Sequence, residues 1–170
     1  IEKYSPDLIK FRYKKENYEQ YKYFSENKIF INKKDFKEEV YPMFLEGYQL
    51  NAIWNSCIRK SCLNNLKIPA ERLRYAEDLM MNLNVFTNIN SAVFINDIYY
   101  FYNTNSNSIT QSKKSSKKWL EILQNATDVY SSLFYYLNIW NMYTEKNIKL
   151  VQERLKKEIN IIINILNTMN

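Results

Sequence analysis

The chain of 170 residues contains a single glycine and no histidine. Loops that cradle phosphates need several glycines at fixed spacing, so Gly47 alone excludes a Walker loop and a GxGxxG dinucleotide loop. The lack of histidine excludes a Ser-His-Asp or Cys-His nucleophile system, and it excludes any zinc site with histidine ligands. Chemistry in this chain must therefore depend on carboxylates, lysine, arginine or tyrosine, or be absent.

Cysteine and long apolar runs are scarce as well. Cys57 and Cys62 lie five residues apart without a second pair, which fits neither a zinc motif nor a disulfide framework. We expect two buried thiols in a reducing compartment. No apolar run approaches the roughly 20 residues that span a bilayer, and the first residues do not resemble a signal peptide. These features predict a cytoplasmic protein.

The residues that are abundant predict a chain with a real core. Apolar residues make up 46% and aromatic residues 16%, which suits one domain of this length. The net charge is +6, from 24 basic and 18 acidic residues. Aromatic side chains could stack on bases, but the basic excess is modest and spread along the chain. We therefore expect no nucleic-acid partner.

Strand patterns occur in three places. Residues 7–13 alternate apolar and charged positions and predict a strand. Residues 18–33 are aromatic and partly alternating, which favours a hairpin. Residues 92–102 are β-branched and aromatic and predict one strand or a pair of strands. Together with the helical segments described next, these patterns predict an α+β fold with few strands and several helices.

Helical spacing appears in three segments of the first two thirds. Apolar residues predict a helix from Asp35 to about Leu45, with Asp35 as the N-cap and Pro42 shortening or kinking it. Residues 50–65 also place apolar side chains on a plausible helical face. A further helix begins around Glu77 and Asp78.

Two amphipathic helices end the chain, from Trp119 to Trp140 and from Ile148 to Leu166, with Thr144 as the N-cap of the second. A polar stretch precedes them, so we divide the chain into a part over 1–112 and a helical extension over 113–170 that forms an αα-hairpin. Lysines flank the apolar stripe of the last helix. We expect this stripe to pack on the domain, and the alternative is peripheral contact with the inner face of the membrane.

Three segments of the sequence are informative through their order and spacing along the chain. They are Trp54-Asn55-Ser56-Cys57-Ile58-Arg59-Lys60, then Ile68-Pro69 followed by Tyr75-Ala76-Glu77-Asp78-Leu79, and then 92–110, which ends in Ser108-Ile109-Thr110. In order and spacing they resemble the second half of the family-2 glycosyltransferases of the GT-A type, which build bacterial surface polysaccharides. Asp7-Leu8-Ile9 resembles a strand of the same family. The resemblance covers residues 1 to about 112.

The resemblance implies a partial GT-A-like fold and an inverting transfer of a sugar. The donor would be a nucleotide sugar, and the acceptor a cell-surface polysaccharide or a lipid-linked sugar. The family's first half carries a D-x-D motif for the nucleotide and for Mg²⁺ or Mn²⁺, and no D-x-D occurs in this sequence. We therefore expect an acceptor-side fragment that has no cofactor or metal ligand of its own and is inactive alone.

The resemblance also implies roles for particular residues. Asp78 would be the catalytic base and Glu77 its support, although carboxylates in a first helical turn are common for stability alone. Trp54 and Asn55 would bind the acceptor, since a tryptophan face suits the C–H surface of a sugar. A core tryptophan and a turn-capping asparagine are the alternatives. Further substrate contacts would come from four residues: Arg59, Tyr102, Ser108 and Thr110.

The sequence departs from the family pattern after Tyr102. Where the family often carries a basic or imidazole group, this chain has Asn103 and Asn105. That change argues against tight contact between this loop and a diphosphate. A second function class also stays open, because the helices over 113–170 could make the chain a non-catalytic module that binds a protein or a membrane.

Overall fold

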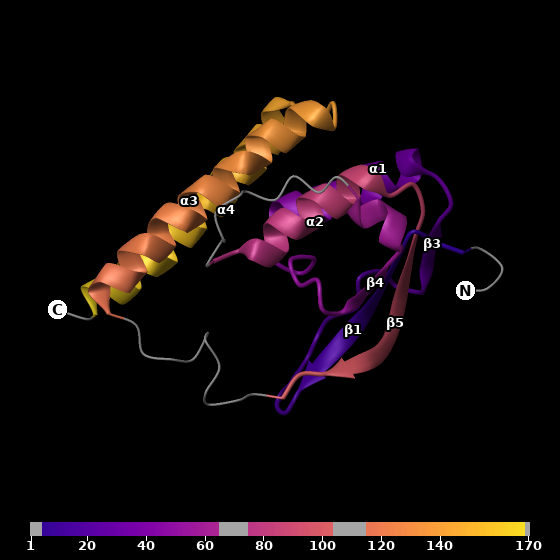
Figure 1. Cartoon of the computed structure of the whole chain (residues 1–170), viewed down its shortest axis with the longest axis horizontal. Coiled ribbons are helices and arrows are strands. Elements are labelled where there is room, and N and C mark those ends of the chain that lie inside the picture. The colour runs from indigo at the N-terminus through magenta and orange to yellow at the C-terminus, as the bar shows by residue number, and fades with distance from the viewer. Residues whose placement is uncertain (1–4, 65–74, 104–114, 169–170) are drawn as a thin grey trace.

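The computed structural model describes residues 5–64, 75–103 and 115–168 and shows a mixed α+β fold (Figure 1). In this part of the chain, helices α1 and α2 lie between a curled sheet and the helix pair α3 and α4. The predicted α+β class and the C-terminal helix pair are thereby confirmed.

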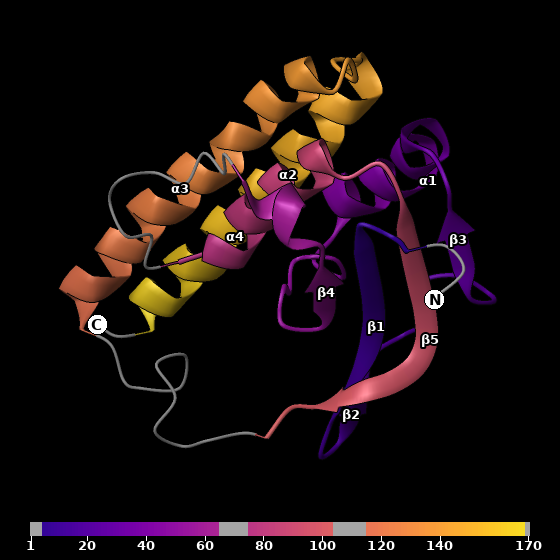
Figure 2. The ribbon, with the colours of Figure 1, turned by 45° about the vertical axis from the view of Figure 1, so that its right-hand side comes forward.

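The sheet is built around two long parallel strands, β1 (Leu8–Lys15) and β5 (Ala92–Phe101). Their register begins with Leu8 opposite Ala92 and shifts around Arg12, and β5 curls at its end beyond this point (Figure 2). The strand predicted over 7–13 is confirmed, and residues 92–102 form one strand rather than two.

Three short strands complete the sheet, each antiparallel to a long strand. β2 (Tyr18–Glu19) and β4 (Ser56–Ile58) pair with β1, and β3 (Lys28–Phe30) pairs with β5. The hairpin predicted within 18–33 is therefore wrong. The two strands of that segment pair with different long strands, so cross-sheet pairing overrides their local pattern.

Helix α1 (Lys33–Glu46) begins two residues earlier than predicted. Its N-cap is Asn32, whose Oδ1 accepts a hydrogen bond from the backbone N–H of Asp35 at 3.0 Å. Asp35 therefore lies in the first turn, and the helix continues past Pro42 for four more residues.

The helical face predicted over 50–65 is wrong. Ser56–Ile58 is a strand held by β1, and only the 3₁₀ helix η1 (Lys60–Leu63) follows it.

The other helices lie where the sequence predicts them. Helix α2 spans Glu77–Asn88, α3 spans Ser116–Ile139 and α4 spans Glu145–Asn167. Thr144 caps α4 as predicted, accepting from the backbone N–H of Asn147 at 3.3 Å. Lys33 donates to the carbonyls of Thr87 and Ile89 at the C-terminal end of α2, a position where a cation complements the helix dipole.

One hydrophobic core runs through the sheet and all four helices. The ring centroids of Tyr41 and Trp140 lie 4.0 Å apart, and Trp140 Nε1 donates to Thr87 Oγ1 at 2.8 Å. Val151 and Ile162 on the stripe of α4 are buried, so this stripe packs on the domain as expected. The predicted boundary between residues 112 and 113 lies outside the described residues.

The structure bears on two expectations from the sequence, the lack of a membrane-spanning segment and the burial of both cysteines. None of the described helices combines the length and the apolar character needed to cross a membrane. Cys57 and Cys62 are both free thiols, but only Cys62 is buried. The expectation of two buried thiols is wrong for Cys57, because β4 is a short edge strand that leaves this side chain in solvent.

Candidate functional site

Asp78 is the second residue of α2, two positions after Ala76, whose backbone is left-handed with φ 56°. Its side chain is half-buried, and Oδ2 accepts a hydrogen bond from the backbone N–H of Ile53 at 3.3 Å. Burial raises the pKa of this carboxyl, and the charge of Glu77 raises it further, while the Ile53 amide and Lys10 act in the opposite direction. The carboxylate is thereby placed between α2 and the segment before β4.

Lys10 is the residue near Asp78 that the sequence prediction missed. It is fully buried, and its Nζ donates to Ala52 O at 2.6 Å, Asn55 Oδ1 at 2.9 Å and Ser56 Oγ at 3.0 Å. Burial lowers the pKa of Lys10 to about 7, and the charge of Asp78 partly opposes this shift. A signal existed in the alternation of residues 7–13, which places this lysine on the same face as buried Leu8.

Asn55 lies behind the surface rather than on it. It is fully buried, and its Nδ2 donates to Phe11 O at 2.9 Å and to Tyr23 Oη at 2.8 Å, while Oδ1 accepts from Lys10. The amide is therefore engaged within the protein. This geometry gives Asn55 a role in holding residues 52–56 in place and leaves no exposed amide to meet an acceptor.

Trp54 belongs to an aromatic cluster formed by Tyr13, Trp54, Tyr100 and Tyr102. Its ring centroid lies 4.7 Å from that of Tyr13, 4.8 Å from Tyr100 and 5.4 Å from Tyr102. The indole is half-buried, so the cluster is neither a closed core nor a loose surface group. The structure thus brings together Trp54 and Tyr102, which the sequence separates by 48 positions.

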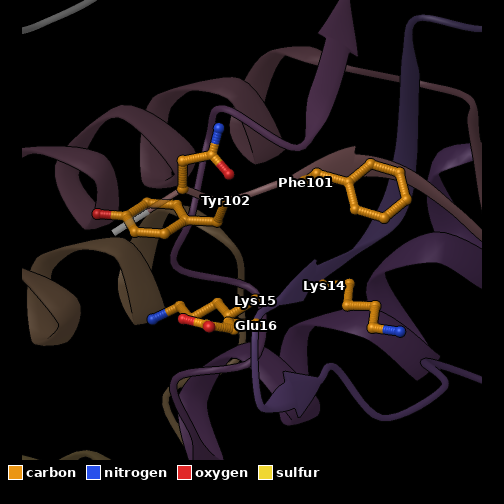
Figure 3. Close-up of a pocket in the computed structure, with 6 residues that line it drawn as sticks. Lys14, Lys15, Glu16, Phe101 and Tyr102 are labelled. Atoms are coloured by element: carbon orange, nitrogen blue, oxygen red, sulfur yellow. The ribbon is translucent and has the colours of Figure 1, made fainter. Parts of the chain in front are cut away.

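A pocket of about 410 Å³ opens beside the aromatic cluster, with Tyr102 common to both (Figure 3). Lys14, Lys15 and Glu16 lie on one side of the opening in Figure 3, and Phe101 and Tyr102 on the other. Lys15 Nζ is 4.8 Å from the Tyr102 ring centroid, in cation–π range. Aromatic faces beside ammonium groups can bind a ring with an apolar face and polar or anionic edges.

A second pocket has a volume of about 240 Å³ and is lined in part by Tyr13. It is lined mainly by tyrosine and glutamine side chains: Tyr13, Tyr18, Gln20, Tyr21, Tyr48, Gln49 and Ala52. Ala52 is the residue whose carbonyl accepts from Lys10. This pocket therefore lies next to the segment that binds Lys10, and it shares Tyr13 with the aromatic cluster.

The other predicted site residues lie elsewhere. Arg59 Nε binds Asp7 Oδ1 at 2.9 Å, at the start of β1, whereas Trp54 contacts Tyr13 near the end of that strand. The structure therefore does not bring Arg59 to the aromatic cluster. Glu77 is exposed in the first turn of α2. Ser108 and Thr110 lie outside the described residues.

The described residues offer no group of three or more carboxylate or thiol side chains placed to hold a metal ion. Comparison with known proteins adds no family. No family model matches the chain, and neither a curated protein nor a solved structure is significantly similar to it. The chemistry of the arrangement must therefore be argued from its residues.

Proposed function

We propose that this chain is the acceptor-side part of an inverting family-2 glycosyltransferase, acting on a cell-surface polysaccharide or a lipid-linked acceptor. The observation that carries the proposal is the setting of Asp78. One carboxylate lies half-buried at a helix N-terminus, and it binds the amide of Ile53, the residue next to Trp54. The resemblance of the segments around Trp54, Asp78 and Tyr102 to that family supports the same assignment.

Asp78 would act as the general base of a single displacement. An acceptor hydroxyl forms the new bond to the anomeric carbon through an oxygen lone pair, its proton passes to an Asp78 oxygen, and the bond to the nucleoside diphosphate breaks. A base works best when its pKa approaches the working pH, and burial raises the pKa of Asp78 in that direction. Glu77 contributes by raising it further.

The nucleotide sugar and the divalent ion belong to the other half of such an enzyme. The described residues do not fit a metal site, so no step proposed here is assigned to a metal held by them. On this proposal the 170-residue chain alone transfers no sugar. The test is an assay of the isolated chain with a panel of nucleotide sugars and Mg²⁺ or Mn²⁺, and measurable transfer would contradict the proposal.

Acceptor binding by the aromatic cluster gives a test that needs no donor half. We expect Trp54→Ala to weaken binding of an oligosaccharide by about tenfold, because the sugar loses its largest stacking surface. Binding is measured by NMR titration of the chain with oligosaccharides from bacterial surface polysaccharides. Tyr143→Ala removes a more exposed aromatic ring, from the connection between α3 and α4, and serves as the control. If both variants weakened oligosaccharide binding equally, the aromatic cluster would not be the acceptor-binding surface.

The alternative of a helical interaction module has less support. The inner faces of α3 and α4 are occupied, since α3 packs on α2 and α4 packs on α1. Exposed apolar residues remain on the outer faces of the pair, among them Leu120, Tyr135, Ile139, Ile161 and Ile163. Peripheral membrane contact through these residues is compatible with the proposed acceptor, and vesicle co-sedimentation of the whole chain measures it.

A further inference from the structure

Helix α4 buries a carboxylate that the proposed reaction does not use. Glu158 is 3% exposed, and three tyrosine hydroxyls donate to it. Tyr48 Oη binds Oε2 at 2.8 Å, Tyr130 Oη binds the same oxygen at 3.3 Å, and Tyr75 Oη binds Oε1. Burial raises the pKa of all three phenols, that of Tyr48 to about 12, so they stay protonated donors throughout the ordinary pH range.

Arg154 lies one turn earlier on α4 and faces the same region. It is also 3% exposed, and its guanidinium donates to the Phe44 carbonyl and to Asn51 Oδ1. Its Cζ lies 5.3 Å from the ring centroids of both Tyr48 and Tyr130. Burying the charges of Arg154 and Glu158 is weak evidence for a purely stabilising role, because removing two charges from water is costly. The contacts of Arg154 and Glu158 join α4 to segments that lie far away in the sequence.

The two segments held by α4 are the ones that surround Asp78. Tyr75 lies three residues before Asp78 and directly before Ala76, the left-handed residue at which α2 begins. Tyr48 and Asn51 lie in the segment that leads to Ile53, whose amide binds Asp78. Asn82, one turn after Asp78 on α2, also ties the two together, because its Nδ2 donates to the carbonyl of Leu50 at 3.0 Å and to that of Asn51.

We propose that Glu158, together with Arg154, is a positioning residue for Asp78, because it fixes both segments between which that carboxylate lies. The C-terminal helix pair then completes the site without contacting substrate. The importance of this role rests on the function proposed above, whereas the positioning itself is measurable without any reaction.

Three tyrosines bonded to one carboxylate provide a matched set of variants. Tyr75→Phe and Tyr48→Phe each remove one hydroxyl that joins Glu158 to a segment around Asp78. Tyr130→Phe removes a hydroxyl bonded to the same carboxylate from α3, a helix that carries neither Asp78 nor Ile53. Each variant loses one hydrogen bond to Glu158, so a purely stabilising role predicts similar effects from all three.

The experiment measures hydrogen exchange of the Ile53 amide and the titration of the Asp78 carboxyl by NMR in the whole chain. We expect Tyr75→Phe and Tyr48→Phe to speed exchange by roughly three- to tenfold, as a loosened hydrogen bond allows. Because water then reaches the carboxylate, the titration midpoint of Asp78 should move down towards the value of a free aspartate. Tyr130→Phe should change neither readout, although its melting temperature falls with those of the other two.

Two outcomes would overturn the positioning role: an effect of Tyr130→Phe equal to that of Tyr75→Phe, or no effect of Tyr75→Phe and Tyr48→Phe. Glu158→Gln is the stronger variant and should exceed both. Should it fail to fold, the phenylalanine variants still decide the matter. Failure of the proposed function is a separate result, because it would appear as normal turnover of an Asp78 variant and would leave these NMR measurements unchanged.

Discussion

On the proposed function, Asp78→Asn is expected to lower the turnover of the intact transferase by on the order of a hundredfold or more, with little change in KM. Asparagine keeps the size of the side chain and can still accept the hydrogen bond from Ile53, so the local fold is preserved. It cannot take a proton from an acceptor hydroxyl. The change therefore removes the base and leaves the surroundings in place.

The measurement is initial-rate sugar transfer by the proposed enzyme, in which this chain is joined to a donor half. Asp128→Asn, an exposed change on α3, gives the same loss of charge away from the site and should be neutral. A rate for the Asp78 variant within a few fold of wild type would end its assignment as the base. A large increase in KM at unchanged kcat would instead make Asp78 a binding group.

The free energy of unfolding should rise by about 3 kcal/mol between pH 7 and pH 9, since one pKa unit corresponds to about 1.4 kcal/mol per group. Burial lowers the pKa of Lys10 to about 7 and that of Lys33 to about 8, from 10.5 when unfolded. Above these values the unfolded chain binds protons that the folded chain has released. Stability therefore increases with pH until the unfolded lysines also titrate near 10.5.

The absence of histidine means that no imidazole titrates in this window. Burial raises the pKa of Cys62 from 9.0, which opposes a small part of the rise near pH 9. Urea unfolding at a series of pH values measures the slope. Lys10→Met should remove the part of the pH dependence that comes from Lys10. It should also lower stability at pH 9, because the oxygens of Ala52, Asn55 and Ser56 lose their buried amine partner. Exposed Lys22→Met is the control. A Lys10→Met profile parallel to that of wild type would show that Lys10 does not carry the slope.

Local patterns predict most of the helices and the two long strands. The spacing of apolar residues gives α2, α3 and α4, and Thr144 gives the start of α4, because capping and amphipathicity act over a few residues. The same reasoning fails over 50–65 and 18–33. There the backbone pairs with strands far away in the sequence, and the outcome depends on neighbours that no local window contains.

The site divides in the same way. Asp78 and Trp54 are found from their own segments, whereas Lys10 and Glu158 acquire significance only through contacts. Lys10 meets Asn55 across 45 positions, and Glu158 meets Tyr75 across 83. From its own segment, a buried charged residue can be recognised only by apolar neighbours on the same face. Lys10 has such a neighbour in Leu8, whereas the charged residues around Glu158 resemble those of a solvated helix face.

The common core has a consequence for how this chain forms during synthesis. Strand β1 pairs with β5 across 84 positions, and the core is completed only by Trp140, Val151 and Ile162. The ribosome releases residues in order, so the apolar faces of α1 and α2 emerge well before the helices that cover them. Nascent chains should therefore remain sensitive to protease until α4 has left the exit tunnel, and a chain ending before Val151 should be degraded rather than accumulate as a stable half.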